Sequence, residues 1–144
     1  MPSVYLASDH RGFRLKEALK HAFPDFVDLG PHTFDPEDDY NDAALAVAKR
    51  VQSEPDAFGV LICGSAIGIS IQANRFKKVR AAVALTPKAV QTTREHNDAN
   101  VLCLSADSLS VHKAKKLIKV FLATPFSGEE RHVRRINRLD QEAN

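Results

Sequence analysis

Short apolar runs alternate with amphipathic stretches along the whole chain. Runs rich in small and β-branched apolar residues predict buried strands at residues 4–7, 26–29, 59–62, 81–85 and 101–104. Helical spacing of the apolar positions predicts helices at residues 12–23, 42–52, 66–74, 87–95, 110–122 and 129–140. This alternation predicts an α/β fold, a doubly wound sheet of five parallel strands with a C-terminal helix.

The order of the strands decides which loops meet. We expect the order 2-1-3-4-5, which places a switch point between the first and third strands. Ligands of open parallel sheets bind there, beyond the carboxyl ends of the strands. Residues 8–12 follow the first strand and residues 63–66 follow the third. These two polar segments are therefore expected to meet in one crevice.

Cys63 stands where the third strand ends and a helix begins. The free N–H groups and the dipole at the start of a helix favour anions, and they lower the pKa of a thiol. The backbone N–H groups of Gly64 to Gly68 are then in place to hold an oxyanion. The alternative is that Cys63 is a small buried hydrophobic residue.

Two further polar segments have both a functional and a structural interpretation. Asp9 and His10 lie at the switch point and are expected to contact a ligand, unless Asp9 caps a helix and His10 is a solvated loop residue. His96 lies near a helix C-terminus, where its charged form is favoured. The alternative for residues 94–100 is a C-cap turn in which Asn97 or Asp98 adopts an unusual backbone angle.

The last predicted helix carries a cluster of arginines. Arg131 and Arg135 are four residues apart and share a face, and Arg134 and Arg138 form a second such pair. Guanidinium groups suit phosphate oxygens, so the cluster is a candidate phosphate clamp. A solvated basic face on a packing helix is the alternative.

Composition narrows the class of protein. The 144 residues are expected to form one domain, 1–144, and a net charge of +2 gives no indication of nucleic-acid binding. No apolar run is long enough to span a membrane, and no signal-peptide pattern is present, so we expect a cytoplasmic protein. The two cysteines and six dispersed histidines form neither a disulfide framework nor a metal-binding spacing.

Several segments, in order along the chain, are together specific for one family. These segments are 8–13 (SDHRGF), 39–40, 63–70 (CGSAIGIS), 73–74, 94–102 (REHNDANVL), 126–128 and 131–132. On them, the chain resembles the ribose-5-phosphate isomerase B family, which includes the galactose-6-phosphate isomerase subunits. The resemblance implies a three-layer Rossmann-like fold and a homodimer or dimer of dimers with sites at the subunit interface. It also implies interconversion of an aldose and a ketose phosphate without a metal or cofactor.

The resemblance also implies roles for individual residues. Cys63 would be the base that moves a proton between C1 and C2, and His96 would help to open the furanose ring. Ser65 stands where the family usually has threonine, and the backbone from Gly64 to Ser70 would hold the enediolate. The remaining substrate contacts implied are those of Asp9, Tyr40 and Asn97 with the sugar, and those of His10, Arg131 and Arg135 with the phosphate.

The chain departs from the family pattern at three places. Asp107 stands where an arginine is usual, so a phosphate contact is replaced by an acid that would accept hydroxyl hydrogen bonds. Ala66 replaces a usual glycine, and Arg11 replaces a usual small residue. Glu129-Glu130 replaces Gly-Gly with one extra residue. These departures leave the isomerase chemistry in place.

The departures leave several alternatives open. The extra residue leaves either Arg134 or Arg135 as the anion clamp. Ribose 5-phosphate is the leading substrate, and another sugar phosphate, a free sugar or a uronate-type sugar is the alternative. A non-catalytic sugar-binding partner subunit is a hypothesis of a different class. A redox-sensing thiol pair of Cys63 and Cys103 is a third.

Overall fold

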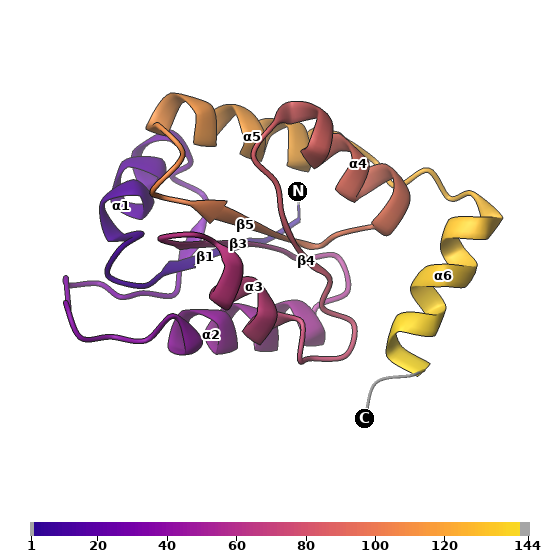
Figure 1. Ribbon diagram of the computed structural model, residues 1–144, viewed down its shortest axis with the longest axis horizontal. Helices are drawn as coiled ribbons and strands as arrows, with labels where there is room; N and C mark the ends of the chain where they lie inside the picture. The colour runs from indigo at the N-terminus through magenta and orange to yellow at the C-terminus, as the bar shows by residue number, and fades with distance from the viewer. Residues whose placement is uncertain (1, 142–144) are drawn as a thin grey trace.

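The computed structural model describes residues 2–141, which form a five-stranded parallel sheet with helices on both faces (Figure 1). The strands are β1 (Val4–Ser8), β2 (Val27–Asp28), β3 (Phe58–Cys63), β4 (Ala81–Val83) and β5 (Val101–Ser105). The helices are α1 (Phe13–Ala22), α2 (Tyr40–Ser53), α3 (Ile67–Ala73), α4 (Pro87–Asn97), α5 (Val111–Ala123) and α6 (Glu130–Gln141). The α/β fold and the C-terminal helix expected from the sequence are confirmed.

The expected strand order is wrong at one edge of the sheet. The observed order is β2-β1-β3-β5-β4, so β5 and not β4 pairs with β3. All five residues of β5 are buried, whereas the three residues of β4 are partly or fully exposed, as suits an edge strand. Placing the more apolar strand in the centre buries more surface, which is the physical reason for the exchange.

Because β5 and not β4 lies next to β3, the helices divide between the two faces of the sheet. Because crossovers between parallel strands are almost always right-handed, the return step from β4 to β5 places α4 on the opposite face from α3. Accordingly, α2 and α3 pack together under one face, and α4 packs on α5 over the other, where α5 also contacts α1. Each face has its own core of buried apolar residues.

One glycine allows α1 to begin directly against the end of β3. A Cβ atom on Gly12 would lie 2.5 Å from the carbonyl oxygen of Ile62 and 2.7 Å from its Cγ2. The amide of Asp9 donates to the same carbonyl at 3.2 Å. This close approach, which a larger residue would prevent, brings the loop after β1 alongside the end of β3.

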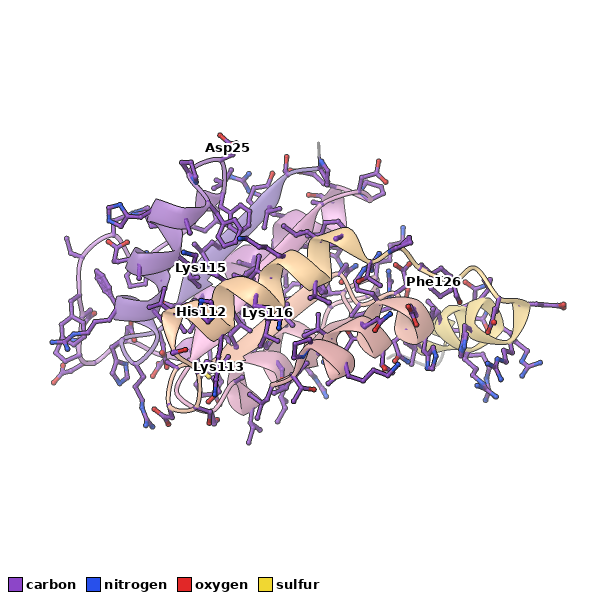
Figure 2. All side chains as sticks on the ribbon, turned by 90° about the horizontal axis from the view of Figure 1, so that it is seen from above. Asp25, His112, Lys113, Lys115, Lys116 and Phe126 are labelled. Carbon is purple, nitrogen blue, oxygen red and sulfur yellow. The ribbon has the colours of Figure 1, made fainter. Side chains whose placement is uncertain are left out.

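The helix α6 extends away from the sheet at the opposite end of the molecule from the start of α1 (Figure 1). It contacts the body through α4, and its Asp140 accepts a hydrogen bond from the amide of Lys78 at 2.8 Å. Figure 2 shows Phe126 in the connection between α5 and α6. Val133 and Leu139 on α6 are exposed apolar side chains. Over residues 2–141, no helix combines the length and the apolar character that crossing a membrane requires.

Candidate active site

Cys63 ends β3 in a tight turn that directs backbone N–H groups at its sulfur. The Sγ atom accepts a hydrogen bond from the amide of Ala66 at 3.2 Å. Ala66 has a φ of 70°, in the left-handed region that a non-glycine residue seldom adopts. The usual family glycine at this position suits that conformation, and here alanine adopts it. The turn therefore orients the start of α3 towards the thiol.

The expectation of a lowered pKa for Cys63 is wrong for the chain as described. Burial raises the pKa of the Cys63 thiol, and the nearby charge of Asp9 raises it further. Hydrogen bonds from the backbone of Ile69, Ala66 and Ser65 oppose these effects and do not outweigh them. The helix N-terminus acts in the expected direction, but removing the thiolate from water costs more.

Asp9 lies beside Cys63, as the meeting of β1 and β3 predicts. Its carboxylate accepts a hydrogen bond from the amide of Gly12 at 3.0 Å, so it closes the turn that leads into α1. The side chain is buried, and burial raises the pKa of the Asp9 carboxyl above its usual range. Asp9 therefore stabilises the turn before α1 and places a carboxyl next to the thiol, and its contact with a ligand stays a prediction.

His10 is held by a carboxylate that the sequence did not single out. Its Nδ1 lies 2.8 Å from Oδ1 of Asp38, and its backbone amide donates to the same oxygen at 2.8 Å. This hydrogen bond is the main reason that the pKa of His10 is raised. The ring is therefore biased towards its charged form, which suits contact with an anion.

Replacing Asp38 tests this arrangement. Asp38→Asn is expected to lower the pKa of His10 because the charged acceptor of the imidazolium is lost. The measurement is an NMR titration of the His10 ring protons. Asp39→Asn is the matched control, since Asp39 is exposed and makes no side-chain cap with α2. An equal fall in the pKa of His10 in both variants would contradict the role of Asp38.

The edge of the sheet next to Cys63 also contains Tyr40, Ser65 and Ser70. The Tyr40 ring lies on Gly68, where a Cβ atom would come within 2.6 Å of the tyrosine Cζ. The Ser65 hydroxyl accepts a hydrogen bond from the amide of Ile67 at 3.2 Å. The Ser70 hydroxyl donates to the carbonyl of Ile67 at 2.7 Å, so it is engaged with its own helix.

The end of β5 is joined to the turn after β3. The Ser105 hydroxyl and the Asp107 amide both donate to the carbonyl of Gly64, at 2.7 and 3.0 Å. The Asp107 side chain accepts a 2.6 Å hydrogen bond from Arg11, so it lies at this edge with the other residues. Residues that follow β1, β3 and β5, together with the start of α2, therefore lie at one edge of the sheet. We call them the thiol group of residues: Asp9, His10, Arg11, Tyr40, Cys63, Gly64, Ser65, Gly68, Ser70 and Asp107.

His96 and the tail arginines lie elsewhere. Because α4 starts after the carboxyl end of β4 and runs back to the start of β5, its last turn lies at the amino ends of the strands, opposite Cys63. There the His96 ring stacks on His132 at 4.6 Å between centroids. His132 is buried, and burial lowers its pKa. We call this second set the histidine group of residues: His96, Asn97, Arg131, His132 and Arg135.

The structure therefore brings the predicted site residues together in two places and not in one. Arg131 and Arg135 are exposed on α6, and Arg131 pairs with Glu129 at 3.1 Å. Asn97 is exposed at the end of α4. In the part of the chain that the structure describes, no cluster of His, Cys, Asp or Glu side chains is arranged to hold a metal ion.

A protein-family model for Ribose/Galactose Isomerase matches residues 4–139. The chain belongs to the ribose/galactose isomerase family. This confirms the resemblance seen in the sequence. A probable ribose-5-phosphate isomerase B of Mycoplasma genitalium is 41% identical over 142 residues, which is 95% of this chain and 93% of the relative. The corresponding protein of Mycoplasma pneumoniae is 39% identical over 140 residues, with 94% and 91% covered.

Solved structures of the isomerase family have the same fold. Ribose-5-phosphate isomerase B from Mycoplasma genitalium, with bound ribulose-5-phosphate, superimposes with a TM-score of 0.92 at 38% identity, covering 96% of this chain and 94% of that one. The Thermotoga maritima ribose 5-phosphate isomerase has a TM-score of 0.92 at 37% identity, covering 97% and 98%. These proteins share the whole fold with this chain.

The sequence did not single out Asp38, the partner of His10, or His132, a member of the histidine group of residues. Asp38 lies in an acidic loop with Asp35, Glu37 and Asp39, so no pattern singled it out as the partner of His10. His132 was noted only as part of a motif next to Arg131. Its place in the apolar spacing with Ile136, four residues on, was the available signal that it faces the body and not the solvent.

Proposed function

We propose that this protein is a metal-independent aldose–ketose isomerase that converts ribose 5-phosphate and ribulose 5-phosphate into one another. One observation supports this most: a buried thiol, a buried carboxyl and a turn of backbone N–H groups lie together at the carboxyl ends of β1 and β3. Removing a proton next to a carbonyl needs a base of this kind and donors aimed at the oxygen that becomes negative.

The proposed reaction moves one proton from C2 to C1 and one from O2 to O1, and it neither adds nor removes an atom of the sugar. The Cys63 thiolate takes the proton from C2 of the open-chain aldose, and the electron pair forms the enediolate. Backbone N–H groups between Gly64 and Ser70 stabilise the negative oxygen. The thiol then returns the proton to C1 while the hydroxyl proton of O2 passes to O1, so that C2 becomes the carbonyl carbon of the ketose. Neither an oxidant nor a reductant is needed, because the substrate is only rearranged.

The side chains around the Cys63 thiol are assigned as contacts with the substrate. Asp9 and Tyr40 contact the hydroxyls or the ring oxygen of the sugar, and Ser65 takes the place of the family threonine. His10 is assigned to the phosphate, which the charge-favouring contact with Asp38 supports. His96 assists the opening of the furanose ring, Asn97 contacts the sugar, and Arg131 and Arg135 contact the phosphate.

These assignments need two copies of the chain. Within one chain, Cys63 and His96 lie at opposite ends of the parallel sheet. We infer a homodimer, or a dimer of dimers, in which the thiol group of one subunit meets the histidine group of its neighbour. The exposed apolar residues Val133 and Leu139 on α6 support such an association. The cytoplasmic location stays a prediction from the sequence.

A panel of sugars tests the proposed function. Purified protein is expected to isomerise ribose 5-phosphate, with weaker turnover of other pentose, tetrose and hexose phosphates and of free or uronate-type sugars. Each reaction is followed by the appearance of ketose. Turnover of another sugar alone would show that the substrate is different. Binding of a sugar without turnover across the whole panel would support the non-catalytic partner subunit.

A further inference from the structure

Arg11 and Asp107 form an ion pair at the edge of the thiol group of residues. The Nη2 atom of Arg11 lies 2.6 Å from Oδ2 of Asp107, and the two side chains are 57% and 48% exposed. The pair connects the loop after β1 with the loop after β5. An exposed pair of this kind contributes little to the stability of a fold, because water screens its attraction. Stability alone therefore gives no strong reason for the pair.

The guanidinium of Arg11 lies directly on the backbone of Gly64. A Cβ atom at residue 64 would come within 2.7 Å of both Cζ and Nε of Arg11, and within 2.9 Å of Nη1. Gly64 follows Cys63, so the positive charge stands one residue from the proposed base. The absence of a side chain at residue 64 is what allows this position.

Asp107 is itself fixed to the same peptide group. Its backbone amide donates to the carbonyl of Gly64 at 3.0 Å. The carboxylate and the amide of Asp107 thus hold Arg11 and Gly64 together. Asp107 holds the Arg11 guanidinium on one side, and the guanidinium lies on the turn that follows Cys63. These two contacts define its position.

Arg11 retains hydrogen-bonding capacity in this position. A guanidinium has five N–H donors, and Asp107 accepts from Nη2. No other hydrogen bond of Arg11 is found among residues 2–141. Guanidinium groups bind phosphate oxygens through two parallel hydrogen bonds. The Arg11 side chain is 57% exposed, so the N–H donors that Asp107 does not use are open to a ligand.

We propose that Arg11 binds the phosphate group of the substrate, and that Asp107 positions its guanidinium over Gly64. The proposal rests on the proposed sugar-phosphate isomerase function. It assigns the phosphate contact to the loop after β1, where the family pattern has a small residue, and it makes Asp107 a positioning residue and not a repelling one. His10, the preceding residue, supplies the neighbouring positive charge.

The test combines kinetics with a binding measurement that needs no turnover. Arg11→Gln is expected to raise the KM for ribose 5-phosphate about tenfold or more and to change kcat less than about threefold, because one charge-assisted contact is lost in both ground and transition states. Inorganic phosphate is expected to raise the unfolding temperature of the wild-type protein and to have a much smaller effect on Arg11→Gln. Arg14→Gln is the matched control, since Arg14 is exposed one turn along α1, and it is expected to behave as the wild type.

The double variant Arg11→Gln/Asp107→Asn separates direct binding from charge neutralisation. If Arg11 binds phosphate itself, the double variant keeps the high KM of Arg11→Gln. A return to the wild-type KM would overturn the proposal, because Arg11 would then serve only to cancel the charge of Asp107. Asp107→Asn alone is expected to raise KM about twofold to threefold through loss of positioning. A fall in KM would overturn the positioning role.

The outcomes also separate this proposal from the proposed function. A wild-type protein that turns over ribose 5-phosphate while Arg11→Gln is unaffected overturns only the role of Arg11. A wild-type protein without isomerase activity overturns the proposed function, and the phosphate effect on unfolding still decides whether Arg11 binds phosphate.

Discussion

Replacing Cys63 with alanine is expected to abolish isomerisation while the fold remains. The thiol is the proposed base, and a positioned general base contributes about 10²- to 10⁴-fold to a rate. We therefore expect kcat to fall by about 10³-fold, which an assay of ketose formation measures. Cys63→Ser is expected to be as inactive, because a serine hydroxyl is a far weaker base than a thiolate near neutral pH.

The fold of the Cys63 variants has to be measured beside their activity. The side chain is small, and the turn after β3 is also held by hydrogen bonds from Ser105 and Asp107 to Gly64. Circular dichroism and thermal melting are therefore expected to show a folded protein. The matched control is Cys103→Ala, which removes the other buried cysteine and is expected to remain active. Unimpaired turnover by folded Cys63→Ala would refute the role of Cys63 as the base.

Mixing two inactive variants is expected to restore activity. His96→Ala should lose about 10²-fold in turnover of the ring-closed sugar, since ring opening loses its acid–base group. A dimer of one Cys63→Ala chain and one His96→Ala chain has one site with both groups intact and one with neither. Purified mixed dimers, isolated through a different tag on each chain, should therefore have about half of the wild-type activity.

The control for the mixed dimer removes the cysteine from both chains. Cys63→Ala paired with Cys63→Ala/His96→Ala has no intact site in any arrangement and is expected to be inactive. If the first mixed dimer is no more active than its parents, Cys63 and His96 do not act across a subunit interface. Full activity of His96→Ala alone would refute the assignment of ring opening to His96.

Local patterns predicted much of this fold. The apolar runs and helical spacings placed every strand and helix of the described residues. The central strands are buried on both faces and are therefore continuous apolar runs, whereas each helix buries one stripe and has a helical period. The strand order was missed at β4 and β5, because order depends on which strand gains most from a central position, a comparison between distant segments. The edge position of β4 agrees with its observed length of three residues and with the partial or full exposure of those residues.

The meeting of Cys63 and Asp9 could be predicted from the sequence, whereas the direction of the pKa shift of the thiol could not. Cys63 and Asp9 were placed together from topology alone, since carboxyl ends of neighbouring parallel strands share one edge. The direction of the pKa shift at Cys63 was not predictable, because it depends on how deeply the sulfur is buried. The separation of His96 from Cys63 follows from the direction of α4, which runs from the carboxyl end of β4 back to the start of β5.

The two edges of the sheet have a consequence for how copies of the chain associate. The edge strands are the shortest of the sheet, two residues in β2 and three in β4. Unpaired backbone groups on long edge strands are templates for aggregation and for pairing between molecules. Such short edges offer little to a second sheet, so we expect the chain to resist growth into extended β-assemblies. The proposed contact between two subunits would then be made by helices and loops.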